Sequence, residues 1–239
     1  MESITTKTVR EMVTDDHRSA AVFEKYAIDF CCNGGTKLVD ACSAKGVDPA
    51  VVVQDLQQLW TKPDTGAFRP DEWDLDALAD FIVNTHHRYV RKSLPLILPH
   101  VDKILSVHGK NHPELKGIAE HFHAIAAELT SHMHKEEMVL FPYIKTLVNA
   151  RNGIASFQRS PFGSIRNPIA MMEAEHRSAG DSLAHIRQAS NGFNPPPDAC
   201  TTYTVTYREL EDFEQDLHQH IHLENNILFP KAIALEDGM

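Results

Sequence analysis

The stretch His132-Met-His-Lys-Glu136-Glu-Met-Val-Leu-Phe-Pro142 is followed 88 residues later by a second copy, His220-Ile-His-Leu-Glu224-Asn-Asn-Ile-Leu-Phe-Pro230, and the copies are identical at six positions. Each copy begins with His-x-x-x-Glu. Because residues four apart on an α-helix lie only about 40° apart in projection, each copy would direct an imidazole and a carboxylate from one helix face. Two such helices facing each other would bring four metal-ligand side chains to one place.

The repeat extends upstream, where His87-Arg88 is echoed by His176-Arg177 at an offset of 89 residues. A helical hairpin used twice would explain both echoes. The repeat therefore predicts six metal ligands: His87, His132, Glu136, His176, His220 and Glu224. Four histidines and two carboxylates suit a pair of metal ions in the core of a helix bundle.

A single His-x-x-x-Glu is more often a surface ion pair than a metal site. Duplication in register favours the metal site, and so do the apolar runs 138–141 and 227–229, which predict that these turns are largely buried. A buried ionisable group needs a partner or a metal. His134 and His222 are expected to face solvent, because each lies about 200° round the helix from the ligands next to it. Glu137 has no acidic counterpart in the second copy and is expected to be a surface charge.

His86 and His108 are the histidines that compete for the site. Only His87 keeps the His-Arg echo, so His86 is set aside. His108 follows His87 by 21 residues and is a secondary candidate if one helix continues through Pro95 and Pro99. Proline removes a backbone donor and crowds the preceding turn, so that helix either ends near residue 94 or continues with a kink.

The ligand types favour iron. Structural zinc sites prefer thiolates, and no cysteine lies near the repeat. Two ions bridged by Glu136 and Glu224, each with two imidazoles, suit iron best and manganese second. We therefore expect a non-haem di-iron centre with an oxo or hydroxo bridge, or a small diatomic ligand, at the remaining positions.

Helical periodicity and chain breakers predict an all-α protein. Residues 1–60 are predicted to form a small domain of short helices, 61–72 a linker rich in proline, and 73–239 four long helices in an antiparallel bundle. The net charge of −10 without a basic run argues against nucleic acid as a partner. No apolar stretch long enough for a membrane span and no signal-peptide pattern is evident, so a cytoplasmic location is expected, with four reduced cysteines.

Several motifs resemble a known family. The doubled His-x-x-x-Glu with Leu-Phe-Pro is similar to hemerythrin-like bundles, and Asp29-Phe-Cys31-Cys32-Asn-Gly-Gly35 resembles the motif that opens Repair of Iron Centres proteins. Other similar segments are MEAEHRSAG around His176, ACTTY from Ala199 and HLENNILFP at the second ligand pair. The resemblance spans nearly the whole chain. It implies terminal iron ligation by the four histidines and bridging by the two glutamates, the same six residues that the repeat selects.

The resemblance also implies a function. It indicates a di-iron protein of the nitrosative and oxidative stress response that helps to repair damaged iron–sulfur clusters, with iron–sulfur proteins as partners. Alternatives are the binding or reduction of nitric oxide and, less favoured, the carriage of O₂, because four histidines replace the five of oxygen-carrying hemerythrins. Whether the protein is an enzyme stays open, as does a homodimer.

Cys31 and Cys32 are the other functional candidates. Adjacent cysteines form strained disulfides, and with Cys42 they offer three thiols, one short of the usual cluster set. We expect transient capture of iron, a nitrosyl or a partner's thiol; the alternative is simple packing of small apolar side chains. Phe30 stands where the family motif often has tyrosine.

Overall fold

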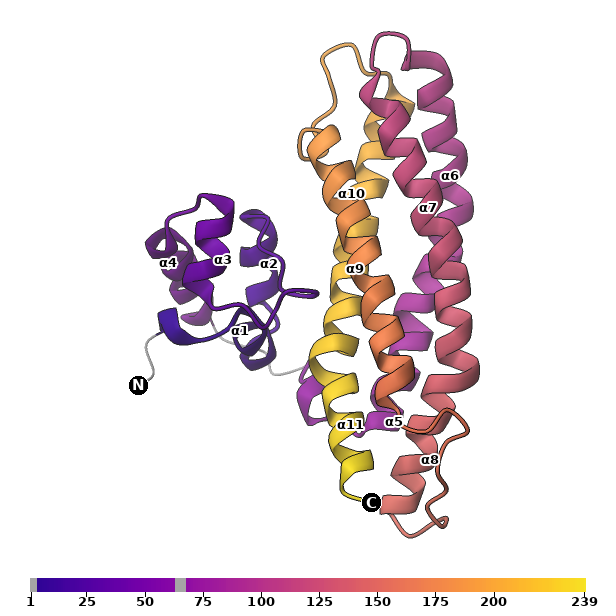
Figure 1. Cartoon of the computed structure of the whole chain (residues 1–239). Coiled ribbons are helices and arrows are strands. Elements are labelled where there is room, and N and C mark those ends of the chain that lie inside the picture. The colour runs from indigo at the N-terminus through magenta and orange to yellow at the C-terminus, as the bar shows by residue number, and fades with distance from the viewer. Residues whose placement is uncertain (1–3, 63–67) are drawn as a thin grey trace. The chain divides into compact units, whose positions relative to one another are not determined.

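The computed structural model describes residues 4–62 and 68–239, and every regular element in these two ranges is a helix (Figure 1). The prediction of an all-α fold is confirmed. Within the same ranges, the one β-type pairing is an isolated antiparallel bridge between Thr8 and Lys37. By internal contacts the chain divides into two units: Met1–Asp74 with Ile221–Lys231, and Leu75–His220 with Ala232–Met239.

Short helices build the first unit. They are η1 (Ile4–Thr6), α1 (Val9–Asp15), α2 (Ser19–Lys25), α3 (Leu38–Lys45), α4 (Pro49–Trp60) and η2 (Pro70–Glu72). Short helices in this part of the chain agree with the sequence prediction. In α3 only two of the eight residues are buried, so this helix has no continuous apolar stripe. α1 begins with a capping box, in which the Glu11 N–H donates to the Thr8 hydroxyl and the Glu11 carboxylate accepts from the Thr8 N–H.

A tight turn at Gly34 closes the loop between α2 and α3. The Arg10 N–H donates to the Gly34 carbonyl at 2.7 Å. A Cβ on Gly34 would lie 2.5 Å from the carbonyl oxygen of Phe30, whereas Gly35 has open space around it. Glycine at position 34 is therefore required by the close approach of backbone to backbone.

The second unit contains the long helices. They are α5 (Leu75–Ile82), η3 (Val83–His87), α6 (Arg88–His108), α7 (Glu114–Lys135), η4 (Glu136–Leu140), α8 (Phe141–Arg151), α9 (Arg166–Ala189), α10 (Thr201–Leu223), η5 (Glu224–Leu228) and α11 (Phe229–Asp237), of which η5 and the adjoining ends of α10 and α11 are counted with the first unit. Figure 1 shows α6, α7, α9 and α10 running side by side as a bundle. The four predicted helical runs are present, and the large buried side chains Phe122, Tyr207 and Phe213 lie in the core.

The prolines do not end the long helices. α6 continues through Pro95 and Pro99 as far as His108, which settles the two alternatives left open by the sequence. Pro142 and Pro230 occupy the second positions of α8 and α11, where their missing N–H groups cost least.

Three π-helical turns, η3, η4 and η5, interrupt these runs at predicted ligands. His87 is the last residue of η3, Glu136 is the first of η4, and Glu224 is the first of η5. A π turn adds one residue to a helical turn and is frequent at functional sites. η4 and η5 also come directly before the helices that begin Phe-Pro, so the wider turn gives the proline ring space.

The predicted linker, 61–72, is described only in part. Residues 63–67 lie outside the described residues, and η2 occupies the last three positions of the predicted linker. No helix in the ranges 4–62 and 68–239 is long and apolar enough to cross a membrane.

Candidate metal centre

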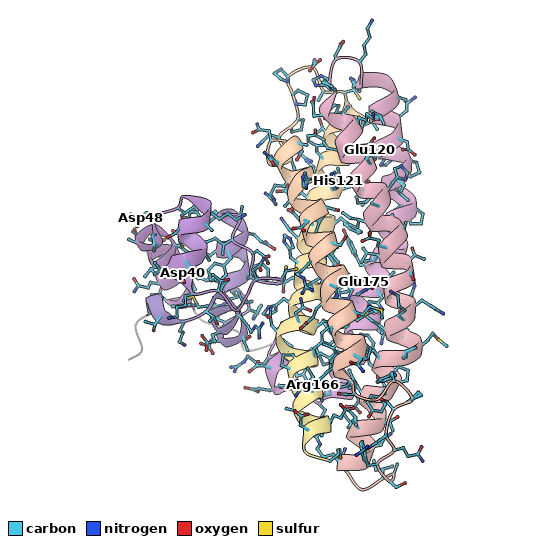
Figure 2. All side chains as sticks on the ribbon, in the orientation of Figure 1. Asp40, Asp48, Glu120, His121, Arg166 and Glu175 are labelled. Carbon is cyan, nitrogen blue, oxygen red and sulfur yellow. The ribbon has the colours of Figure 1, made fainter. Side chains whose placement is uncertain are left out.

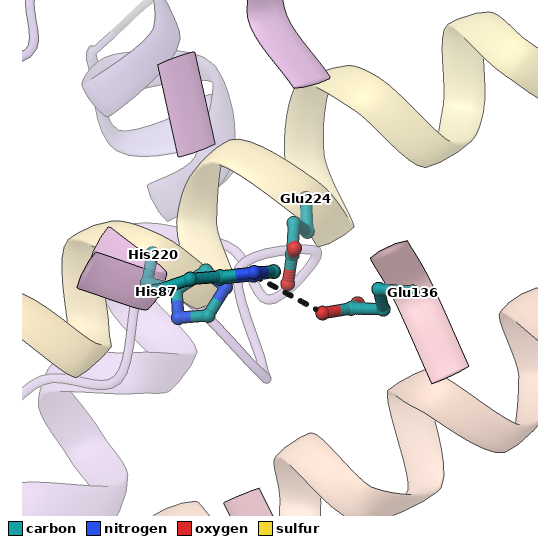
Figure 3. Close-up of side chains that lie close together, drawn as sticks. All are labelled: His87, Glu136, His220 and Glu224. Carbon is teal, nitrogen blue, oxygen red and sulfur yellow. Dashed lines mark ion pairs between the residues drawn. The ribbon is translucent and has the colours of Figure 1, made fainter. Parts of the chain in front are cut away.

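The structure brings the six predicted ligands into two overlapping groups. Within each group the ligand atoms all lie within 4.8 Å of one another, and the groups are His87, Glu136, His220, Glu224 and His132, Glu136, His176, Glu224. Figure 3 shows the first group, with both carboxylates directed toward the two imidazoles. All six residues are at most 1 % exposed. Both glutamates belong to both groups, so a pair of ions would share them.

Glu136 divides its two oxygens between the groups. Its Oε2 lies 3.3 Å from Nε2 of His87, and its Oε1 lies 3.3 Å from Nε2 of His132. Nε2 of His132 is in turn 3.1 Å from Nε2 of His176. A carboxylate with one oxygen toward each set of imidazoles has the arrangement of a bridging ligand.

Two further carboxylates contact the Nδ1 atoms of two of the imidazoles. Oε1 of Glu137 lies 2.6 Å from Nδ1 of His87, and Oε2 of Glu175 lies 2.8 Å from Nδ1 of His132. A carboxylate at Nδ1 holds the proton there and leaves Nε2 free to bind a metal. The prediction that Glu137 is a surface charge is therefore wrong. Glu175, which Figure 2 labels on the bundle, was not anticipated at all.

Each supporting carboxylate also has a cation beside it. Arg91 donates to Glu137 at 2.6 Å, and Lys135 donates to Glu175. Burial by itself would raise the pKa of Glu137, but the hydrogen bonds from His87 and Arg91 outweigh it and the pKa is lowered. The pKa of Glu175 is lowered in the same way, since its bonds from Lys135 and His132 outweigh its burial. Both groups are therefore carboxylates at neutral pH.

The other histidines near the repeat belong to neither ligand group. His134 is exposed, as predicted. His222 is not: it is 2 % exposed, its Nδ1 lies 2.9 Å from the Asn226 amide, and burial lowers its pKa to about 4. The helix there is covered on that side, which periodicity alone could not show. His86 belongs to neither group; its Nδ1 lies 3.0 Å from Asp216, and its ring stacks on His220.

His108, the secondary candidate, lies at the other end of α6 from His87. At ~1.5 Å per residue, 21 residues of helix separate them by about 30 Å. His108 is in neither ligand group, and its Nε2 lies 3.2 Å from Sγ of Cys200. This secondary candidate therefore lies away from both groups, because sharing a helix face does not shorten the distance along the axis.

The apolar runs after the two glutamates are buried to different degrees. In the second copy, residues 227–229 are all buried, as predicted. In the first copy Leu140 and Phe141 are buried, but Met138 and Val139 are 64 % and 46 % exposed. The two copies therefore share their ligand geometry while differing in what covers them.

Cys31 and Cys32 lie in the turn after α2, with Cys31 buried and Cys32 partly exposed. Neither is joined in a disulfide, and their sulfur atoms are 3.8 Å apart. Together with Asp29 they form a third group whose ligand atoms lie within 4.8 Å of one another. Cys42 is buried and does not belong to this group.

The bundle and its His/Glu groups define a hemerythrin-like cation-binding domain. Residues 78–232 match the family described as hemerythrin HHE cation binding domain. Residues 5–60 match a second family, ScdA_N, which is described as a domain of unknown function.

Relatives that match nearly the whole chain identify the family more closely. The chain is 35 % identical over 226 residues to proteins named iron-sulfur cluster repair protein YtfE from Citrobacter koseri and Escherichia coli, covering 95 % of this chain and 96 % of each relative. The protein of that name from Escherichia fergusonii is similar to the same extent. The chain therefore belongs to the Repair of Iron Centres family, as the sequence motifs indicated.

Proposed function

We propose that the bundle binds two iron ions, one in each His/Glu group, with Glu136 and Glu224 shared between them. The observation that carries this proposal is the division of Glu136, with one oxygen 3.3 Å from His87 and the other 3.3 Å from His132. Four imidazole nitrogens and carboxylate oxygens without sulfur suit iron better than structural zinc.

The electrostatics of the site fit a pair of cations. Glu136 and Glu224 are 0 % exposed, and their oxygens lie within 4.8 Å of each other. Two buried carboxylates at this separation repel each other strongly and lack the hydration that would stabilise them. Two divalent ions would supply four positive charges, enough to balance both carboxylates and leave a formal charge of +2.

We further propose that the protein takes part in the repair of damaged iron–sulfur clusters, with iron as the cargo that it supplies. The relatives named for this repair cover nearly the whole chain. In this role the imidazoles and carboxylates hold the iron, while Glu137 with Arg91 and Glu175 with Lys135 keep two of the imidazoles oriented. Damaged iron–sulfur proteins would be the partners that receive it.

The test is transfer of labelled iron to an acceptor. The protein is loaded anaerobically with ⁵⁷Fe, its iron content and Mössbauer spectrum are recorded, and an iron–sulfur protein stripped of its cluster is then added with sulfide. We expect two irons per chain, a spin-coupled spectrum, and appearance of ⁵⁷Fe in the rebuilt cluster.

A matched pair of variants controls this experiment. His132→Ala removes a buried proposed ligand, whereas His134→Ala changes an exposed histidine of the same helical turn. We expect the first to lose iron and transfer and the second to keep both. Two irons that remain in the bundle while the acceptor stays empty would contradict iron donation but leave the di-iron site standing.

A second candidate function is the binding or reduction of nitric oxide. It is favoured by the sharing of both carboxylates, because two ions so bridged would lie side by side, and each would have only four protein donors. Two small ligands could then be held close enough to react. Consumption of nitric oxide with release of nitrous oxide would support reduction, tight binding without turnover would support capture, and a stable O₂ adduct would instead support oxygen binding.

We place this activity in the cytoplasm, where a reducing environment would keep the four cysteines as thiols. We also propose the domain limits 1–60 and 73–239, with 61–72 as the linker between them. Limited proteolysis tests these limits.

The chain could also form a homodimer. The mass of the native protein in solution decides whether two copies associate.

A further inference from the structure

Three metal-type donors gather outside the bundle, in the turn that follows α2. The ligand atoms of Asp29, Cys31 and Cys32 all lie within 4.8 Å of one another. Oδ1 of Asp29 is 3.3 Å from Sγ of Cys31, which is 3.8 Å from Sγ of Cys32. These separations are similar to those between donors around a single metal ion.

Asp29 is held in place by the backbone of the same turn. Its Oδ1 accepts from the N–H of Cys31 at 3.0 Å and from the N–H of Cys32 at 2.8 Å. Its Oδ2 accepts from the Asn33 side-chain amide at 2.7 Å. These three hydrogen bonds fix the carboxylate beside the thiols.

The carbonyls of the turn are also fixed, by two asparagines of the first unit. The side-chain amide of Asn226 donates to the Phe30 carbonyl at 3.0 Å, and that of Asn225 donates to the Cys31 carbonyl at 3.3 Å. Both asparagines are only 8 % exposed. A turn held at both its N–H and its C=O groups presents its donors in a preformed arrangement, which lowers the cost of ordering them around an ion.

We propose that Asp29, Cys31 and Cys32 form a second metal site, which binds one divalent iron ion through a carboxylate oxygen and two thiolates. Binding forms two Fe–S bonds and one Fe–O bond, and the two S–H protons pass to the solvent. The site then carries a net charge of −1, and a fourth position is left for water or an acceptor's ligand. The third donor is thus a carboxylate, not the Cys42 thiol that the sequence brought into consideration.

Loss of both thiol protons would place three negative charges close together in this turn. The Asp29 carboxylate oxygen is 3.3 Å from the sulfur of Cys31, which is 3.8 Å from the sulfur of Cys32. Three negative charges in this turn are therefore unfavourable until a cation balances them. Metal binding and loss of the thiol protons are coupled, so affinity will rise with pH.

The test uses Co²⁺ on the full-length protein, reduced and without oxygen. Thiolate ligation to Co²⁺ gives a charge-transfer band in the near ultraviolet that imidazole and carboxylate ligands do not give. Co²⁺ bound in the bundle therefore does not contribute to this band. We expect this band to saturate at one Co²⁺ per chain beyond the amount that the bundle takes up. Its affinity should rise by about 100-fold per pH unit while both thiols are protonated, because two protons leave.

Variants assign the ligands. Cys31→Ser and Cys32→Ser should each weaken the band or abolish it, whereas Cys200→Ser, at an exposed thiol elsewhere in the chain, should leave it unchanged. Asp29→Asn should lower the affinity for Co²⁺ by at least 10- to 100-fold (about 1.4–2.7 kcal/mol). That is the typical loss when a residue that only hydrogen-bonds to a metal ligand is replaced, and Asp29 is proposed as a ligand itself. Circular dichroism and X-ray absorption at the cobalt edge check folding and count the sulfur ligands.

Three results would overturn the site: a band that survives Cys31→Ser with Cys32→Ser, a band lost in Cys200→Ser, or a cobalt-edge absorption spectrum without sulfur neighbours. Asp29→Asn with unchanged affinity and intact fold would exclude the carboxylate as a ligand. This inference concerns the first unit and does not depend on the proposed role of the bundle. Failure of iron transfer from the bundle would leave the Co²⁺ result as it stands.

Discussion

The carboxylate of Glu137 lies 2.6 Å from Nδ1 of His87, and the Arg91 guanidinium donates to the same oxygen. Glu175 likewise contacts Nδ1 of His132 through one oxygen, and its other oxygen accepts from Lys135. Each ligand group therefore contains one imidazole with a charged carboxylate behind it. The carboxylate keeps the ring in the tautomer that presents Nε2 and makes that nitrogen a better donor.

Replacement of Glu137 by Gln should weaken metal binding at the group that contains His87. The amide keeps the size of the side chain but loses the charge that holds the proton on Nδ1, and outer-shell changes of this kind cost about 10- to 100-fold in affinity. Competition with a chelator measures the change. Met138→Gln is the matched control, because Met138 is the next residue and is 64 % exposed. Equal affinities for both variants would show that Glu137 does not act through His87.

Replacement of Glu136 by Gln should reduce the bound iron from two ions to one or fewer per chain. Each Glu136 oxygen faces a different group of imidazoles, so one substitution disturbs both positions. Glu120→Gln, at an exposed position on α7, is the control and should keep both ions. Iron analysis of the purified proteins measures the number of ions bound per chain. Two ions retained by the Glu136 variant would assign the bridge to Glu224 alone.

The repeat predicts the six proposed ligands but not the two carboxylates that contact their imidazoles. His132 and Glu136 are four apart on one helical run, and their copy repeats in register, so periodicity placed them together. Glu137 supports an imidazole on η3, and Glu175 supports one on α7, each from a different helix. The spacing of residues along the chain does not predict contacts between helices. The roles of Glu137 and Glu175 could therefore be seen only in the packed structure.

The burial of His222 escaped prediction because residues distant in the sequence cover that side of the helix. A regular helix of ~3.6 residues per turn placed His222 on the solvent side. In the structure the Phe30 ring lies 5.7 Å from the His222 ring, and Asn226 contacts His222 as well. Contacts between residues nearly 200 positions apart therefore override the local pattern.

Replacement of Gly34 by Ala should destabilise the turn that carries the thiols, while Gly35→Ala should not. A Cβ at position 34 would lie 2.5 Å from the Phe30 carbonyl oxygen, whereas nothing lies within 4 Å of one at position 35. Overpacking of this kind costs about 1–3 kcal/mol. Denaturant unfolding of the two variants measures the difference. Equal stabilities would mean that the turn can shift without loss.

Removal of metal should lower the thermal stability of the bundle. An ion that binds only the folded state stabilises it in proportion to the logarithm of its concentration over Kd, about 4 kcal/mol at 1,000 times Kd. The six proposed ligands are buried, come from different helical runs, and converge only when the bundle is folded. Calorimetry with and without a chelator should show a drop in Tm for the native sequence and for His134→Ala, and a much smaller drop for His132→Ala. The same Tm for loaded and stripped native protein would show that the ions contribute nothing to holding these helices together.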